Sequence, residues 1–359
     1  MLTSIESSTP SALIGTVSSS QGPLQVSLST QADGKIQGLL FKPVPTTTGT
    51  PTSWGAVDQR LAALAPQVGM LSAEVEKDGS CTPVHALNER QTRPTGSMFK
   101  VYVLGAVAHQ IDAGELKWDQ QLEITEQVKS LPTGVLQDEP AGTMVGIADA
   151  ATKMISISDN TTADLLAQTV GRAAVESTQH AFGSTHAERN VPFLRTKELF
   201  VLKGADYPKY ADAYLQLSPE ERSQYLSATI DPVPRSKITG WQEPRDIEKL
   251  EWFASPQDLC KAFAALDSLA SKPGLEPICT IMSTSDGGLG LDPKSWPSVW
   301  FKGGAEQGVL SLGWKATNAQ GRTFVTAMMT ANPKNAINAG AAASELASLT
   351  RGAFALAQK

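Results

Sequence analysis

Long apolar runs, cysteines and excess positive charge are all scarce in this chain. No segment holds the roughly 20 consecutive apolar residues of a membrane-spanning helix, which excludes a helical span. The net charge of -6 argues against a nucleic-acid partner. Hydrophobic residues make up 41% and charged residues 18% of the 359 residues, a globular composition that allows one large domain, or one large and one small.

The cysteines and histidines give no sign of a metal site. Cys81, Cys260 and Cys279 are far apart and lack metal-ligand spacing. Their odd count argues against a disulfide framework, so we expect buried free thiols. The four histidines form no His-x-x-x-His pattern and no evident carboxylate pair, and we expect structural or surface roles for them: His85, His109, His180 and His186. The sequence therefore predicts no metal and no cofactor.

Residues 1–53 differ from the rest of the chain. They begin without a basic segment followed by an apolar one, so no secretory signal is visible and we expect a cytoplasmic protein. Alternating residues and a turn at 32–34 predict a small antiparallel β-meander. Its expected strands are 15–20, 24–30 and 35–41. A Pro/Thr/Gly linker follows at 43–52, so we expect one unit at 1–53 and a second at 54–359.

From residue 54 the patterns predict helices and strands in blocks. The expected helices are 54–68, 97–108, 143–155, 163–170 (opened by residues 156–162), 255–266 and 336–357. The expected strands are 69–75, 82–87, 299–302, 308–314 and 322–330, with turns at 303–304 and 318–321. Strands at both ends with helices between them predict an α+β fold: a five-stranded antiparallel sheet flanked by helices, a helical subdomain and the short N-terminal β-meander.

Ser97 and Lys100 stand at the start of the apolar helix. Their spacing places both side chains on one helical face. A serine hydroxyl needs an adjacent base to become a nucleophile, and a lysine can serve if burial or a second cation lowers its pKa. The helix N-terminus also favours developing negative charge. On their own, the two residues are also explained by a serine that caps the helix and a lysine that extends to solvent.

Two further motifs favour the catalytic interpretation of Ser97 and Lys100 over the structural one. Ser-Asp-Asn occupies residues 158–160 at a predicted helix start, and Lys-Gly-Gly occupies residues 302–304 at the end of a predicted strand. With Ser97 and Lys100, the set resembles the Ser-x-x-Lys, Ser-Asp-Asn and Lys-Thr-Gly motifs of class A β-lactamases and penicillin-binding proteins. The resemblance covers residues 54–359 and implies the serine β-lactamase fold.

The resemblance also implies a role for each residue. Ser97 would be the acylated nucleophile, with Lys100 as its activator, alone or through a relay with Ser158. Ser158 would pass a proton between the lysine and the leaving group. Asn160 would hold a substrate amide or orient Lys100. Lys302 would anchor a substrate carboxylate and keep Lys100 neutral by like-charge repulsion.

The same resemblance assigns backbone groups to the site. The N–H groups of Ser97 and Ala305 would form the oxyanion hole. Gly304 and Ala305 would line the substrate beside Lys302. Asp159 is expected to cap the helix that it precedes.

Three departures from the family pattern bear on the reaction. Gly303 replaces a threonine or serine, and Ala305 offers no hydroxyl to a substrate carboxylate. No Glu-x-x-Leu-Asn follows the second motif, and Glu198, near the expected distance, is expected on a helix face instead. Without that carboxylate no dedicated base places the hydrolytic water. We therefore expect weak β-lactam hydrolysis, with simple esters less affected.

A closer resemblance extends over four runs, at residues 97–100, 192–200, 252–260 and 301–304. They resemble the β-lactamase-like proteins of actinobacterial clavam biosynthesis, which join a ketosteroid-isomerase-like domain to a β-lactamase-like domain. Residues 1–45 would match only the last strands of that first domain. The resemblance implies esterase-type activity on cephalosporin acyl side groups.

The leading hypothesis is thus a serine hydrolase that forms an acyl-enzyme on small ester or β-lactam-related substrates. A true class A β-lactamase or D,D-peptidase is the second enzymatic alternative. A module that binds β-lactams or peptidoglycan fragments without turnover is the third. No nucleic-acid or membrane partner is expected, and the sequence does not indicate an oligomeric state.

Overall fold

The computed structural model describes residues 2–9, 12–19, 22–30, 36–43 and 49–359. Its N-terminal part is a four-stranded antiparallel sheet in the order β1-β2-β3-β4. The strands are β1 (Leu2–Thr9), β2 (Ala12–Ser19), β3 (Gly22–Thr30) and β4 (Ile36–Pro43). The expected meander is therefore present with one strand more, β1. The expected turn at 32–34 and residues 44–48 of the linker lie outside the described residues, and the division at residue 53 stays a prediction.

The central sheet has five antiparallel strands in the order β11-β12-β13-β5-β6. They are β5 (Gln67–Val75), β6 (Cys81–Leu87), β11 (Ser298–Glu306), β12 (Val309–Thr317) and β13 (Thr323–Ala331). The apolar runs of β12 and β13 are buried almost without a break, as expected for strands covered on both faces. The predicted α+β class and the five-stranded antiparallel sheet are confirmed.

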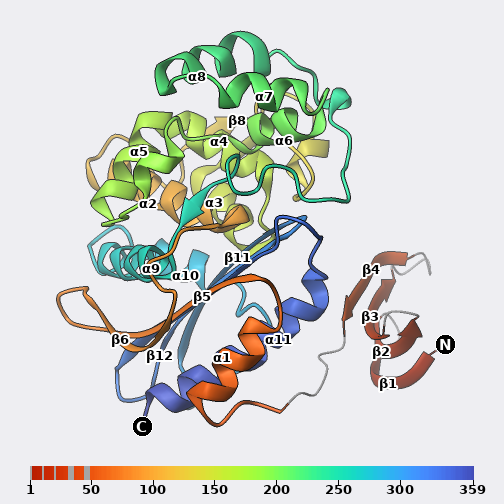
Figure 1. Ribbon diagram of the computed structural model, residues 1–359, viewed down its shortest axis with the longest axis vertical. Coiled ribbons are helices and arrows are strands. Elements are labelled where there is room, and N and C mark those ends of the chain that lie inside the picture. Colours follow the sequence, from red (N-terminus) through yellow and green to blue (C-terminus); the bar gives the residue numbers. More distant parts are fainter. Residues whose placement is uncertain (1, 10–11, 20–21, 31–35, 44–48) are drawn as a thin grey trace.

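One face of this sheet is covered by the first and last helices of the second unit, α1 (Trp54–Ala62) and α11 (Ala339–Ala357) (Figure 1). Ser53 caps α1 and Asn338 caps α11 through their side chains. The Ala-rich face of α11 brings Leu346 and Phe354 against the sheet in a continuous apolar core. Helices from the two ends of the second unit thereby cover the same face of the sheet.

The other face carries α2 (Lys100–Asp112), α9 (Pro256–Ala270) and α10 (Pro277–Met282), and the helical block lies beyond them (Figure 1). The block holds α3 (Ile147–Ser156), α4 (Asn160–Val170), α5 (Arg172–Ala181), α6 (Thr196–Gly204), α7 (Lys209–Leu215) and α8 (Pro219–Tyr225). Short strand pairs, β7 (Arg93–Pro94) with β10 (Phe253–Ala254) and β8 (Gln121–Glu123) with β9 (Met144–Gly146), complete it. One large core joins the sheet to this block, so the boundary between them is well packed.

Several expected boundaries are wrong for local reasons. The helix expected over 54–68 ends at Ala62, since Pro66 follows and β5 begins at Gln67. The helix expected from residue 143 begins at Ile147, after β9. No turn occurs at Gly303 and Gly304, because β11 continues through them to Glu306. The chain reverses at Gly308 instead, where φ is +83°.

The expectation of three free buried thiols is also wrong. Cys81 of β6 and Cys260 of α9 form a disulfide across 179 positions, and Cys279 is the exposed free thiol. The odd count excludes only complete pairing, and the packing of α9 on the sheet edge brings the two sulfurs together. Disulfides persist mainly in oxidising compartments, so the bond does not favour the predicted cytoplasmic location.

No helix in the described part of the chain is long and apolar enough to cross a bilayer.

Reduction of this disulfide should destabilise the fold without a change of topology. A crosslink across 179 positions restricts the unfolded chain, and we expect its loss to cost roughly 2–5 kcal/mol. Cys81→Ser should therefore melt several degrees below the parent in calorimetry, whereas Cys279→Ser should not. Intact mass before and after reduction should differ by two hydrogen atoms. Equal melting temperatures for the two variants would contradict a structural disulfide.

Candidate active site

Ser97 lies in a 3₁₀ turn, Gly96–Phe99, directly before α2. The turn packs against β11 at close range. Gly96 has a φ of +51°, and a Cβ there would come within 2.7 Å of the Ala305 nitrogen. A Cβ on Gly304 would collide with the backbone of residues 95–97. Glycine is thus required on both sides of the contact, which keeps the Ser97 segment beside the strand that carries Lys302.

Ser158 occupies a strained backbone conformation, with a φ of +58°. Its hydroxyl oxygen accepts hydrogen bonds from two amines, Lys100 Nζ at 3.1 Å and Lys302 Nζ at 3.0 Å. A hydroxyl has two acceptor lone pairs and one donor. When both amines are protonated they occupy the two lone pairs, and the Ser158 hydrogen is left to donate in a third direction. This arrangement suits a group that delivers a proton.

Lys100 is completely buried among oxygen acceptors. Its Nζ also donates to the Ser158 carbonyl and to Asn160 Oδ1, each at 2.6 Å. Burial first, and the nearby Lys302 second, hold the pKa of Lys100 well below its usual value. A lysine in this state can accept a proton from a neighbouring hydroxyl.

Asn160 links Lys100 to the facing loop. Its Nδ2 donates to the Leu131 carbonyl at 2.8 Å while its Oδ1 accepts from Lys100. The geometry fits the predicted orienting role. Asp159 caps α4, as its side chain accepts from Thr162 N at 2.9 Å, which confirms the expected cap.

Lys302 projects from β11 and is 2% exposed. Besides Ser158, its Nζ reaches the Gly303 carbonyl at 2.6 Å. Burial lowers the pKa of Lys302 to about 7. One residue from each of the three motifs therefore meets at Ser158. The roles that the resemblance implies for these residues, including the carboxylate-anchoring role of Lys302, stay predictions. At Gly303 a Cβ would meet the Leu312 side chain at 2.8 Å, so a larger residue there would require that side chain to move.

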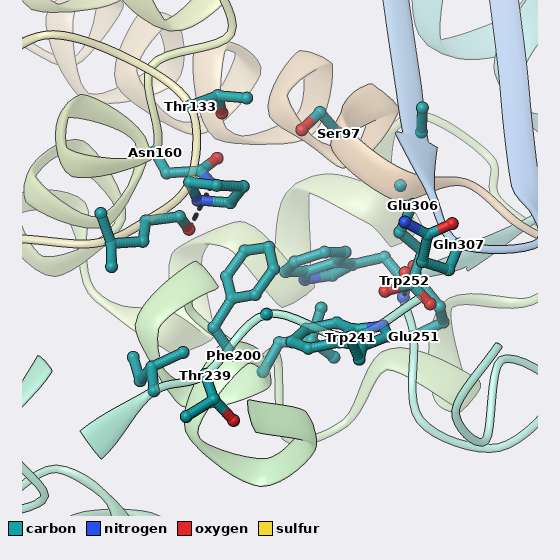
Figure 2. Close-up of a pocket in the computed structure, with 17 residues that line it drawn as sticks. Ser97, Thr133, Asn160, Phe200, Thr239, Trp241, Glu251, Trp252, Glu306 and Gln307 are labelled. Carbon is teal, nitrogen blue, oxygen red and sulfur yellow. Dashed lines mark hydrogen bonds between the residues drawn. The ribbon is translucent and has the colours of Figure 1, made fainter. Parts of the chain in front are cut away.

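A cavity of about 240 Å³ opens beside Ser97. Figure 2 shows the Ser97 hydroxyl directed to the side where Asn160 and Thr133 lie. Ala305 lines the same cavity, so both expected oxyanion-hole residues border it, although their role stays a prediction. Most of the remaining wall is apolar: Leu131, Pro132, Leu199, Phe200, Ile238, Trp241 and Trp252.

The sequence did not identify the aromatic side of this cavity. Phe200, Trp241 and Trp252 lie in a polar stretch with weak secondary-structure patterns, and their only signal is that large aromatic residues recur there. Two carboxyl groups, Glu251 and Glu306, also line the cavity and were not predicted.

Glu198 is not among the cavity-lining residues in the described part of the chain. It lies in the first turn of α6, fully buried, and its Oε1 pairs with Arg172 at 2.7 Å and Arg195 at 2.9 Å. The expectation that Glu198 lies on a helix face and does not act on the acyl-enzyme is consistent with these contacts.

The histidines are partly paired, which the sequence did not predict. His186 Nδ1 lies 2.7 Å from Asp258, and His85 Nε2 lies 2.8 Å from Asp58. In the described part of the chain no group of three His, Cys, Asp or Glu residues could hold a metal ion.

A serine that borders a cavity beside two buried lysines, on this sheet and helical block, defines a serine hydrolase of the β-lactamase and penicillin-binding-protein fold. The model of the β-lactamase enzyme family matches residues 59–354. The chain therefore belongs to this family of enzymes.

Solved structures show the same fold. A β-lactamase from Sphaerobacter thermophilus is 20% identical, with 86% of this chain and 98% of that one covered and a TM-score of 0.61. A variant of PBP-A, solved as an acyl-enzyme complex with penicillin G, is 17% identical, with 85% and 98% covered and a TM-score of 0.56. A β-lactamase from Francisella tularensis is 12% identical, with 82% and 96% covered and a TM-score of 0.57. No curated protein matches the chain.

The lowered pKa of Lys302 predicts a pH effect that depends on substrate charge. Below about pH 7 the ammonium attracts a substrate carboxylate, and above it the neutral amine does not. For an ester that carries a carboxylate, kcat/KM should therefore fall more steeply above this pH than for the matched methyl ester. Lys302→Arg should remove the difference, because a guanidinium stays charged. Parallel pH profiles for the two esters would show that Lys302 does not bind the carboxylate.

Proposed function

We propose that this serine hydrolase is an esterase that acts through a Ser97 acyl-enzyme and has weak β-lactamase activity. The observation that carries the proposal is the shared contact of Lys100 and Lys302 on Ser158, next to a cavity bordered by Ser97. The contacts of Glu198 with two arginines support the second half, because they leave that carboxylate engaged elsewhere.

The reaction begins when Ser97 Oγ attacks the ester carbonyl and its proton moves to neutral Lys100. The bond from Oγ to carbon forms as the carbonyl oxygen becomes an oxyanion, which the N–H groups of Ser97 and Ala305 stabilise. The tetrahedral intermediate then loses the alcohol, which takes its proton from Ser158. Lys100 returns a proton to Ser158, and water later cleaves the acyl-enzyme.

Small apolar esters suit this site best. The wall around Trp241 and Phe200 favours an apolar acyl group through burial. A small acyl group leaves part of the 240 Å³ cavity to the hydrolytic water. Acyl-enzymes of simple esters need less assistance in this step than those of β-lactams. We add β-lactam-related esters to the candidate substrates because of the resemblance of four sequence runs to clavam-biosynthesis proteins.

A β-lactamase or D,D-peptidase is the second candidate. The family match and the fold shared with PBP-A, which forms an acyl-enzyme with penicillin G, favour it. A receptor that stays acylated is the third, supported by the engaged Glu198. Nitrocefin turnover as fast as ester turnover would favour the second, and acyl mass retained for hours would favour the third. The cytoplasmic location stays a prediction, which the Cys81–Cys260 disulfide does not favour.

Replacement of the nucleophile tests the mechanism directly. A fluorophosphonate should add one adduct to the parent chain, and peptide mapping should place it on Ser97. Ser97→Ala should lose the adduct and at least about 10³-fold of the p-nitrophenyl ester kcat. Ser177→Ala, a change of the same kind on α5, should retain both. Unchanged turnover in Ser97→Ala, or no labelling of the parent, would reject the proposal.

Removal of one aromatic wall tests the substrate class. Trp241→Ala should lower kcat/KM for a phenylacetyl ester about tenfold, because the ring loses its apolar contact. For an acetyl ester, which does not reach this wall, the change should stay below about twofold. Trp118→Ala removes a tryptophan that is not in the cavity and should affect both esters equally. A uniform loss in Trp241→Ala would contradict an acyl-binding role.

A further inference from the structure

Two carboxyl groups meet on the cavity wall next to Ala305. Glu251 precedes Trp252, and Glu306 is the last residue of β11; their side chains are 1% and 7% exposed. Both carboxyls lie against the same amine, and each has one buried oxygen without a hydrogen-bond partner among the described residues. Lys203 of α6, also buried, forms an ion pair with Glu306, and its Nζ lies 3.9 Å from Glu251 Oε1. Two carboxyls of the cavity wall thus lie against one buried amine that does not itself line the cavity.

The charges balance only if the carboxyls share a proton. Two carboxylates beside one ammonium would leave a net negative charge out of contact with water, which is unfavourable. When both are ionised, Glu251 Oε1 and Glu306 Oε2 have no hydrogen-bond donor among the described residues. One proton between the carboxyls supplies that donor and makes the cluster neutral. Burial first, and Glu306 second, raise the pKa of Glu251 to about 8, and burial raises the pKa of Glu306.

Each carboxyl is tied to one half of the oxyanion hole. Glu251 accepts from the backbone N–H of Trp252 at 2.8 Å, and the Trp252 carbonyl accepts from the N–H of Thr95, two residues before Ser97, at 2.8 Å. Glu306 directly follows Ala305 in the chain. A contact between the two carboxyls therefore joins the segment that carries one predicted donor to the strand that carries the other.

We propose that the Glu251–Glu306 pair, joined by one shared proton, positions the two backbone N–H groups of the oxyanion hole. This proposal rests on the acyl-transfer function proposed above. The pair acts through the backbone and does not touch the reacting atoms, so both glutamates are positioning residues.

Loss of the shared proton should impair the site in two ways. The two carboxylates would repel each other and loosen the contact between the Gly96 segment and β11. The cluster would also become negative beside a developing oxyanion. The charged groups that face the pair are Lys203 from α6 and, behind it, Arg245, which donates to the Lys203 carbonyl. Neither group contacts the two unpartnered carboxyl oxygens by a hydrogen bond in the described part of the chain.

The test compares Glu251→Gln with Glu251→Ala on a neutral p-nitrophenyl ester and a neutral fluorophosphonate. In the parent, kcat and the rate of Ser97 labelling should decline above about pH 8. The glutamine amide donates to Glu306 without titrating, so Glu251→Gln should remain within about threefold at pH 7 and lose the decline. Glu251→Ala should lose about 10²-fold in kcat with little change in KM. Glu306→Gln makes the same exchange from the other side and should reproduce Glu251→Gln.

Controls separate this proposal from fold stability and from the proposed function. Glu198→Gln also removes a buried carboxylate and should keep the parental decline, and thermal melting of each variant reports on folding. Infrared spectra should show a protonated carboxyl that disappears as the pH passes about 8 in the parent and is absent from Glu251→Gln. If the fluorophosphonate labels the parent but the decline of kcat with pH persists in Glu251→Gln, only the proposed role of the carboxyl pair is rejected. A parent that is not labelled rejects the proposed function, and the positioning role with it.

Discussion

The hydroxyl of Ser158 is hydrogen-bonded to side chains from the sheet and from the helices beside it. Lys100 comes from the buried start of α2 and Lys302 from β11, and both amines donate to this single oxygen. Two ammonium groups this close and this deeply buried cannot both remain fully charged at low cost. The lowered pKa values of the two lysines express that constraint. On the proposed mechanism, acyl transfer at Ser97 depends on a lysine that is neutral.

Backbone packing sets the distances on which this contact depends. Gly96 and Gly304 let the Ser97 turn approach β11 more closely than any side chain would allow. The positive φ of Ser158 is held by neighbours, since Thr133 Oγ1 donates to its carbonyl at 2.7 Å and Asp159 N donates to the Lys153 carbonyl. These two hydrogen bonds offset the backbone strain at Ser158 and hold its hydroxyl in place.

The parts that could be predicted from sequence are those with local signals. The alternating and apolar runs of β5, β12 and β13 identified the sheet, and the three motifs identified the residues that meet at Ser158. Contacts that depend on tertiary packing could not be predicted. Cys81 and Cys260 are 179 positions apart, and only the position of α9 against β6 makes them partners. The aromatic wall could not be predicted either, because Trp241 and Trp252 belong to loops without periodic patterns.

The two walls of the cavity have different effects on an acyl-enzyme. On the Asn160 side the polar groups already have partners, and Glu198 is paired with Arg172 of α5 and with Arg195, which directly precedes α6. On the Trp241 side the wall is apolar and excludes water. A small acyl group leaves space for a water molecule in the 240 Å³ cavity, whereas a bulky one displaces it. On the proposed mechanism, the size of the acyl group therefore decides whether the enzyme turns over or stays acylated. The same site then acts as a hydrolase with small acyl groups and as an acylated receptor with bulky ones.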